Sequence, residues 1–267
     1  MERNTLKLAA YLDEAGEDPE RGCKALNENQ IFYTVLRHVW TGNVCGISDV
    51  GHQRLLKILV EHDITVIMVA SDLGKIDSKQ LVRIGDDQID NVINICKYYK
   101  APMMRVFIGE ENPNTTIEEI DNWMERISKK CLSNGVIPLL EIVSGSQIHS
   151  APEVAQLLSK HKTWKLLYDP VSLIMKQNID PFIRYWTLLK NHVAAVDVRD
   201  MKIGKGFKPA GFGDSKIDMT IVDALGSRYQ GWFIIESSLG RKHGTEVTKS
   251  GTFKYALEGL DHILQDL

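Results

Sequence analysis

Short apolar runs recur along the whole chain, and each is followed by a longer segment with a helical pattern of apolar residues. The runs are rich in Val, Ile, Leu or aromatic residues and are bounded by Gly, Pro, Asn or Asp, as is typical of buried parallel strands. Strict alternation of strand and helix predicts parallel pairing, because each crossover returns the chain to the same direction. The eight runs are residues 6–11, 32–38, 64–71, 103–109, 137–143, 164–169, 193–200 and 232–237.

Four of the intervening segments carry clear helix signals. Residues 48–62 place apolar side chains on one face, and residues 116–134 begin with a capping box at Thr116 and Glu119. Residues 151–161 have Pro152 in the first turn, and residues 251–267 form the closing helix. These helices complete the alternating pattern.

Eight strand–helix units in 267 residues predict a (β/α)8 TIM barrel, formed by residues 1–267 as a single domain. A closed barrel also leaves no sheet edge exposed. A doubly wound open sheet is the structural alternative. It is less favoured, because no GxGxxG motif follows the first run and the number of units matches closure.

Charge and composition exclude several classes of function. The net charge of −3 and the absence of basic blocks argue against a general binder of nucleic acid or membrane surfaces. No apolar stretch reaches the ~18 residues of a membrane span, and the first residues lack the apolar region of a signal peptide. The four cysteines show no CxxC spacing. We therefore expect a cytoplasmic protein that acts on a small molecule.

Acidic residues stand at the ends of four successive strands, namely Glu141, Asp169, Asp197 and Glu236. In such a barrel the functional groups come from the carboxyl ends of the strands. Carboxylates that converge there repel one another unless a cation binds or protons are shared. Oxygen ligands without Cys or His favour Mg²⁺ or Mn²⁺. Alternatively, some of these acids cap helices or pair with arginine, and Asp169 before Pro170 suits a cap.

Fragments near nearly every strand occur in the order found in one known superfamily. The chain resembles the xylose isomerase-like barrels, specifically their sugar phosphate isomerase/epimerase branch. The matching fragments are LRHVWTGN at 36–43, VASDLGKI at 69–76, MRVFIG at 104–109, LLE at 139–141, YDPVS at 168–172, DVRD at 197–200, PAGFGD at 209–214 and IESSL at 235–239.

The resemblance implies a divalent metal, Mg²⁺ or Mn²⁺, held by four residues, and an acid/base pair for proton exchange beside a carbonyl. The metal ligands would be Glu141, Asp169, Asp197 and Glu236, and the acid/base pair would be Glu141 and Glu236. This chemistry is sound, because a polarised carbonyl makes the neighbouring proton acidic enough for a carboxylate to remove.

The chain departs from the family pattern around these acids. The family usually has His at the position of Asp197 and Lys at that of Arg199; four further departures lie at Leu36, Ile142, Ser172 and Ser238. Exchange of His for Asp adds a negative charge, and exchange of Lys for Arg changes the geometry of the hydrogen-bond donors.

Five basic residues are candidates for substrate binding: Arg37, Arg105, Arg199, His38 and Lys75. A guanidinium at a strand end can hold a substrate carboxylate or phosphate, although an ion pair with the acids is the alternative for Arg37 and Arg105. The Gly- and Lys-rich segment 202–214 is expected to cover the site.

The sequence predicts an isomerase or epimerase of a small sugar, polyol or hydroxy-acid, in a chain that forms a possible homodimer. Three alternatives stay open. A lyase or dehydratase uses the same proton abstraction. A non-catalytic barrel explains the departures from the family pattern. An endonuclease for abasic DNA shares the barrel but needs a histidine-rich zinc cluster, which is not evident here.

Overall fold

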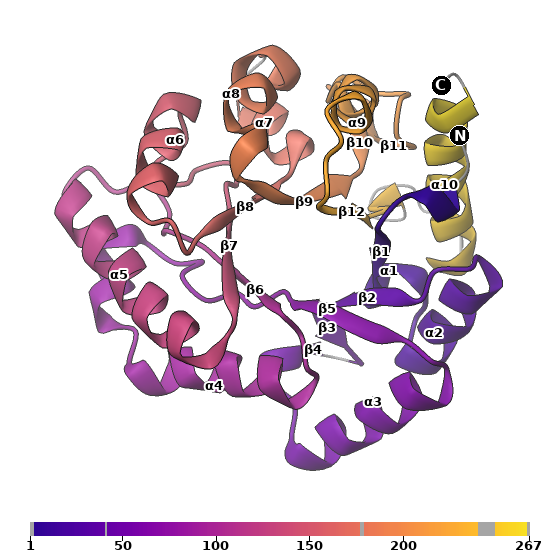
Figure 1. Cartoon of the computed structure of the whole chain (residues 1–267), viewed down its shortest axis with the longest axis horizontal. Coiled ribbons are helices and arrows are strands. Elements are labelled where there is room, and N and C mark those ends of the chain that lie inside the picture. The colour runs from indigo at the N-terminus through magenta and orange to yellow at the C-terminus, as the bar shows by residue number, and fades with distance from the viewer. Residues whose placement is uncertain (1–2, 41, 177–178, 240–248, 266–267) are drawn as a thin grey trace.

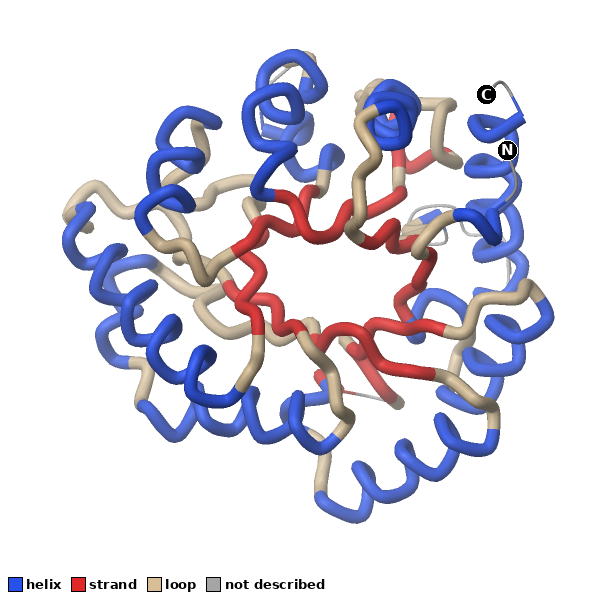
Figure 2. The backbone as a smooth tube through the Cα atoms, viewed as in Figure 1, coloured by secondary structure: helices blue, strands red, loops and turns tan. Residues whose placement is uncertain are grey.

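Eight parallel strands close into a barrel at the centre of the molecule, and helices surround it (Figure 1, Figure 2). The computed structural model describes residues 3–40, 42–176, 179–239 and 249–265. The predicted (β/α)8 barrel is confirmed, and the open sheet is wrong, because β1 pairs with β12 and closes the ring. In ring order the strands are β1 (Leu8–Tyr11), β12 (Trp232–Ile235), β9 (Val193–Val198), β8 (Lys165–Tyr168), β7 (Ile137–Glu141), β6 (Met103–Val106), β5 (Thr65–Val69) and β2 (Tyr33–Leu36).

Each barrel strand lies within one of the predicted apolar runs, and every strand except β1, which ends with its run at Tyr11, ends before that run does. The remaining residues turn out of the sheet into the loops at the carboxyl ends. Gly74 shows how tightly these loops pack, because a Cβ there would lie 2.1 Å from the carbonyl oxygen of Phe107 and the backbone has a φ of +83°. The loops that follow β5 and β6 are therefore packed closely together.

The helices form the outer layer of the molecule (Figure 2). The predicted helices 48–62, 116–134 and 151–161 are confirmed as α3 (Asp49–Glu61), α5 (Ile117–Asn134) and α6 (Ala151–Lys160). The closing helix is α10 (Lys249–Gln265); its predicted last residue, Leu267, lies outside the described residues, as does Thr41 of the 36–43 motif. The other α-helices are α1 (Leu12–Ala15), α2 (Pro19–Glu28), α4 (Asp86–Tyr98), α7 (Pro170–Lys176), α8 (Thr187–Leu189) and α9 (Ile217–Gly226).

Shorter elements fill the connections. Two small hairpins are formed by β3 (His38–Val39) with β4 (Gly42–Asn43) and by β10 (Asp200–Lys202) with β11 (Gly206–Lys208). Short helical turns are Arg3–Thr5, Val44–Gly46, Ser78–Arg83, Lys190–His192 and the π-helical turn Phe182–Trp186. Within the described ranges, every helix is too short or too polar to cross a membrane.

The core has two parts. Side chains inside the barrel pack against one another, among them Tyr11, Met103 and Leu139. A larger cluster lies between the strands and the helices and contains the fully buried Trp123 and Trp186. Alternate strand residues therefore face two apolar environments, which explains the continuous apolar runs in the sequence.

The capping box that starts α5 forms as predicted. Thr116 Oγ1 accepts from the backbone N–H of Glu119 at 3.3 Å, and Glu119 Oε2 accepts from the backbone N–H of Thr116 at 2.8 Å. We expect Thr116→Ala to lower the free energy of unfolding by about 1 kcal/mol. Urea titration followed by circular dichroism measures this loss. Ser133→Ala, an exposed position on the same helix, is the control, and an equal loss in both variants would contradict the capping role.

Candidate active site at the barrel mouth

The four predicted acids gather at the carboxyl end of the barrel. Glu141 ends β7, Asp169 follows β8, Asp197 lies in β9 and Glu236 follows β12. All four are buried, with exposed fractions between 1% for Asp197 and 6% for Glu141. Burial raises the pKa of Glu141, Arg105 opposes this rise, and the charges of Asp169 and Glu236 add to it. The acids are thus close enough to affect one another's ionisation.

Arg105 holds Glu141 in place. Its Nη1 donates to Glu141 Oε2 at 3.1 Å, and its Nε donates to the carbonyl oxygen of Ser71 at 3.1 Å. Its Nη2 donates to the carbonyl oxygen of Ala70 and to Asp72 Oδ1, each at 3.3 Å. All three nitrogens of this guanidinium are therefore bound to protein oxygens. Arg105 thus forms the ion pair that was the alternative drawn from the sequence, and its contact with substrate stays a prediction.

Asp169 is bound through both of its oxygens. Its Oδ1 accepts from Arg199 Nε at 2.9 Å and from the backbone N–H of Val171 at 3.0 Å. Its Oδ2 accepts from Arg199 Nη2 and from the hydroxyl of Ser172. Since Pro170 is the first residue of α7, Asp169 also caps this helix, as the alternative interpretation of the sequence proposed.

Arg37 connects the first, second and last strand–helix units. Its Nη1 donates to Glu236 Oε1 at 2.6 Å and its Nη2 donates to Glu14 Oε1 at 2.7 Å. Asp13 Oδ2 accepts from Arg37 Nε at 3.0 Å and from Nη2 at 2.9 Å. The guanidinium also lies 4.4 Å from the centre of the Tyr11 ring. Arg37 is only 5% exposed, so its position rests on protein partners.

Asp13 and Glu14 belong to the site, and the sequence interpretation missed them. They lie in α1, two and three residues after the end of β1, slightly further along the strand–helix unit than the acids that were recognised. Glu14 is buried, and its Oε2 accepts from the Ser237 hydroxyl at 2.8 Å and from the backbone N–H of Ser238 at 3.1 Å. Applying the strand-end criterion to the first strand identifies both acids.

Asp197 is the one predicted acid without an arginine hydrogen bond among the described residues. Its Oδ1 is buried and has no partner there, and neither has the hydroxyl of Tyr11. Burial raises the pKa of Asp197 well above its usual range, and the charges of Glu236, Asp169 and Glu141 raise it further. The neutral acid is therefore favoured at this position.

Two further polar atoms at the mouth make no hydrogen bond with any described part of the protein. They are Oε1 of Glu141, whose Oε2 is held by Arg105, and Nη1 of Arg199, whose Nε and Nη2 bind Asp169. A carboxylate oxygen that can accept a proton and a guanidinium nitrogen that can donate a hydrogen bond thus occur together in one buried cluster.

His38 and Lys75 lie at the edge of this cluster. His38 Nδ1 is 3.4 Å from Asp13 Oδ2, and the side chain is 49% exposed. Lys75 is exposed, with its Nζ 5.5 Å from the centre of the Phe107 ring. The structure places both residues near the acids or their partners but gives neither a buried position.

Segment 202–214, expected as a cover over the site, begins as a hairpin that Asp200 anchors. The buried Asp200 carboxylate accepts from four backbone N–H groups: Met201 at 2.8 Å, Gly211 at 3.1 Å, Gly213 at 2.8 Å and Ser215 at 3.0 Å. A Cβ on Gly213 would lie 2.2 Å from Asp200 Oδ1, which explains the glycine. Asp200 follows Arg199 directly, so the anchored hairpin begins at the residue after this arginine.

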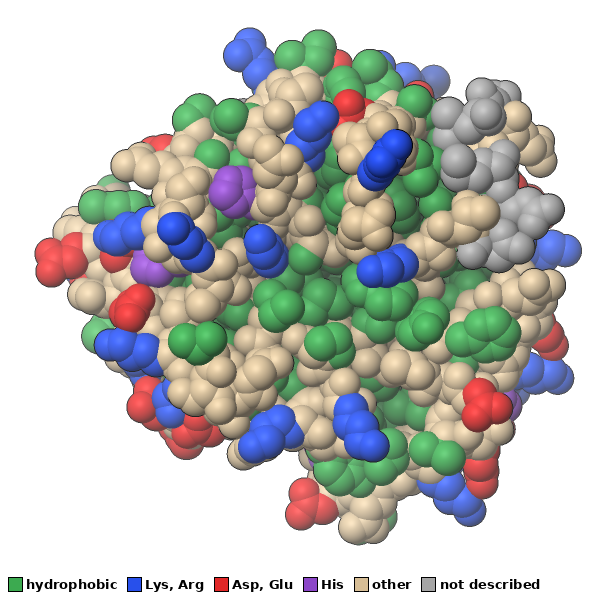
Figure 3. Space-filling view, viewed as in Figure 1, with side chains coloured by type: hydrophobic (Ala, Val, Ile, Leu, Met, Phe, Trp, Pro, Cys, Tyr) green, Lys and Arg blue, Asp and Glu red, His purple; other side chains and the backbone are tan. Residues whose placement is uncertain are grey.

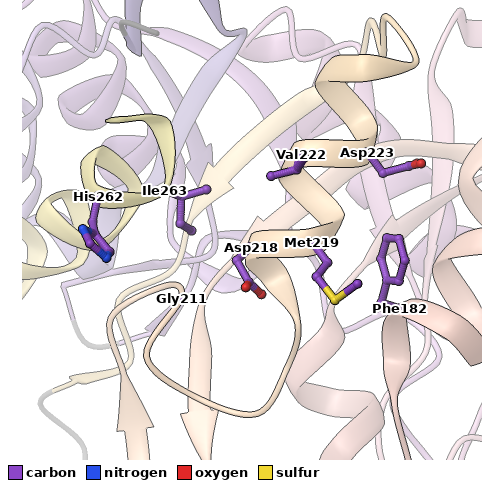
Figure 4. Close-up of a pocket in the computed structure, with 8 residues that line it drawn as sticks. All are labelled: Phe182, Gly211, Asp218, Met219, Val222, Asp223, His262 and Ile263. Atoms are coloured by element: carbon purple, nitrogen blue, oxygen red, sulfur yellow. The ribbon is translucent and has the colours of Figure 1, made fainter. Parts of the chain in front are cut away.

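A groove of about 460 Å³ lies outside the barrel, between α9 and α10, and is lined by Met219, Val222 and Ile263 among others (Figure 4). None of the predicted site residues lines it. On the face shown in Figure 3, hydrophobic side chains and a few Lys or Arg side chains lie near the centre. This is the view of Figure 1, in which the ring runs clockwise from β1 through β2 and β5, so the strands begin on this face and the acids of the mouth lie at the opposite end of the barrel.

Comparison with known proteins now adds to this geometry. The family model described as xylose isomerase-like TIM barrel matches residues 32–261. The chain belongs to this family. No curated protein matches the sequence.

Solved structures with the xylose isomerase-like fold resemble the chain over nearly its whole length. A xylose isomerase domain containing protein from Salmonella typhimurium LT2 is 10% identical, with a TM-score of 0.79 and coverage of 99% and 100% of the two chains. The IolI protein with a bound zinc atom is 14% identical (TM-score 0.77, coverage 98% and 99%). The D-allulose 3-epimerase from Methylomonas sp. in complex with D-allulose is 12% identical (TM-score 0.74, coverage 98% and 97%). Identities this low establish the shared fold.

The donor set of this xylose isomerase-like barrel does not fit a divalent cation. Both oxygens of Asp169 are occupied, and Glu141 and Glu236 each bind a guanidinium. In the described part of the chain, no three His, Cys, Asp or Glu side chains form a group that could hold a metal ion. The four acids predicted as metal ligands lie together, but arginine holds three of them.

Proposed function

We propose that this xylose isomerase-like barrel moves a proton at the carbon beside a carbonyl group of a small sugar, polyol or hydroxy-acid, as an isomerase or epimerase. The proposal rests on the carboxylate of Glu141. Its Oε1 makes no hydrogen bond with the described residues, and its Oε2 accepts one from Arg105. Burial raises the pKa of Glu141, which brings a carboxyl group closer to the range where it exchanges protons at neutral pH.

Glu236 is proposed as the second acid/base group. β8 and β9 separate its strand, β12, from β7, so the two glutamates enter the mouth from different parts of the ring. Removal of a proton from one face of a carbon and delivery to the other face requires two groups placed apart. Arg37 and Arg199 contact the two oxygens of Glu236 at 2.6 and 3.4 Å and position it.

The carbohydrate-like substrate class is supported by the epimerase among the similar structures, which was solved with D-allulose bound. Arg199, through its open nitrogen, and the exposed His38 and Lys75 are proposed as substrate contacts. Arg37 and Arg105 are proposed as positioning residues, because all of their nitrogens bind protein oxygens. The Mg²⁺ or Mn²⁺ predicted from the sequence has no part in this proposal, because the donor set does not fit it.

Proton exchange in D₂O tests the proposal. The purified chain is incubated with a panel of ketoses, keto-polyols and keto-acids, and NMR follows deuterium uptake beside the carbonyl. We expect Glu141→Gln and Glu236→Gln each to slow exchange by about a hundredfold or more. Glu118→Gln, an exposed position on α5, is the matched control. Exchange at the wild-type rate in Glu141→Gln would refute the assigned base.

The same spectra separate the alternatives. A dehydratase removes the same proton but loses water, so its product lacks the elements of water, whereas an epimerase product keeps the substrate's formula. The non-catalytic barrel gives no exchange with any compound of the panel.

A further inference from the structure

Among the three arginines of the mouth, Arg199 differs from Arg37 and Arg105 in one nitrogen of its guanidinium group. Every nitrogen of the Arg37 and Arg105 guanidinium groups donates to a protein oxygen. Arg199 donates through Nε and Nη2 to Asp169, and through Nη2 to Ser172 Oγ at 3.1 Å, while its Nη1 has no acceptor among the described residues.

Arg199 lies centrally among the acids. It follows β9, its Nε is 2.9 Å from Asp169 Oδ1 beyond β8, and the same nitrogen is 3.4 Å from Glu236 Oε2 beyond β12. Its side chain is only 10% exposed. The permanent positive charge of Arg199 therefore lies between Asp169 and Glu236, two of the four acids that would have to bind a metal ion.

We propose that Arg199 takes the place of a divalent cation in this barrel: the mouth binds no such cation, and Nη1 of Arg199 donates a hydrogen bond to the carbonyl oxygen of the substrate. A cation would have to displace Arg199 from both oxygens of Asp169 and would then face its charge at short range. The repulsion between a divalent ion and a guanidinium a few ångströms away is strong in a buried site.

The catalytic part of this inference rests on the proposed function. Glu141 takes the proton from the carbon beside the carbonyl, the electron pair of the C–H bond forms a C=C bond, and the carbonyl π pair moves onto oxygen. The oxygen, now negative, accepts a stronger hydrogen bond from Nη1, which favours the transition state over the ground state. Return of a proton to carbon restores the C=O bond, so the step needs no further reactant.

Binding of Mn²⁺ tests cation exclusion without any substrate. Free Mn²⁺ is titrated into the purified full chain and followed by electron paramagnetic resonance, with melting temperatures recorded in parallel. We expect no stoichiometric binding to the wild type and no change in its melting temperature with Mn²⁺, Mg²⁺ or EDTA. We expect Arg199→Met to bind Mn²⁺ tighter by about a hundredfold, because the variant lacks the cation that binds both oxygens of Asp169 and lies 3.4 Å from Glu236 Oε2.

Two further variants complete the design. Arg199→Gln removes the same charge and replaces Arg199→Met if that variant does not fold. Arg21→Met removes an exposed arginine of α2 and should behave like the wild type. One equivalent of Mn²⁺ bound by the wild type, and lost in Glu141→Gln, would overturn the inference. So would Arg199→Met or Arg199→Gln protein that folds but binds Mn²⁺ no better than the wild type.

The catalytic role has its own readout. Arg199→Lys keeps the charge but loses the planar donor geometry, and we expect deuterium exchange to slow by about tenfold or more while Mn²⁺ still does not bind. Exchange at the wild-type rate in Arg199→Lys would show that Nη1 of Arg199 does not take part in the reaction. It would not affect the assignment of Glu141 as the base. If the exchange experiments show that Glu141 is not the base, the Mn²⁺ result is unaffected. The proposed function and the exclusion of a cation can therefore be refuted independently.

Discussion

Replacement of Arg37 by methionine is expected to lower the free energy of unfolding by about 3–5 kcal/mol, because the variant leaves buried acids without their cation. Arg37 holds Glu236, Glu14 and Asp13 at distances of 2.6 to 3.0 Å. Methionine fills similar space but donates no hydrogen bond. For a chain of this size the melting temperature should fall by roughly 10 °C.

Urea unfolding followed by tryptophan fluorescence and circular dichroism measures this change. Arg21→Met is the control, because its side chain is 69% exposed and its ion-pair distances to Glu17 and Asp18 are both 3.8 Å. The control should shift stability by less than about 0.5 kcal/mol. If both variants unfold at the same urea concentration as the wild type, the buried ion pairs of Arg37 do not stabilise the fold.

Replacement of Asp200 by alanine is expected to cost about 3 kcal/mol or more and to open the hairpin of β10 and β11. The carboxylate accepts from four backbone N–H groups, of which that of Ser215 is buried, and each hydrogen bond to a charged group contributes about 1.5–3 kcal/mol. The hairpin carries Lys202, Lys205 and Lys208, so its opening should speed cleavage by trypsin at these residues.

Mass spectrometry of the tryptic fragments locates the cleavage, and chemical denaturation gives the loss of stability. Asp214→Ala is the matched control in the same loop: Asp214 accepts one backbone N–H, from Ile203 at 2.9 Å, and is partly exposed. Its loss of stability should be smaller than that of Asp200→Ala. Equal protease resistance in the wild type and Asp200→Ala would show that other contacts hold the hairpin.

The fold was predictable from the sequence because the apolar runs have the length and composition of buried parallel strands. The strand ends were less certain. The run 103–109 continues apolar through Ile108, yet β6 ends at Val106, because Phe107 and Gly109 bond to the loop that follows β5. Contacts between loops of different units decide such boundaries, and a single run does not contain that information.

The acids of the site were predictable, whereas their partners were not. A carboxylate at a strand end is visible in the sequence, and the same criterion would have found Asp13 and Glu14. The pairing of Arg37 with Glu236 joins residues 199 positions apart, and it depends on how β1, β2 and β12 are arranged in the closed ring. For Asp169 the sequence allowed a ligand or a cap, and only the position of Arg199 and the start of α7 separates these two roles.

The barrel cannot close during synthesis until its last strand, β12, has been made, because β12 pairs with β1. At about 5–20 residues per second, Glu236 leaves the ribosome roughly 10–40 s after Arg37. Until then β1 has only one neighbouring strand, and its other edge is open to pairing with foreign chains. Nascent chains that still lack the last strand are therefore the form most exposed to aggregation, and the form that chaperones have the most reason to shield.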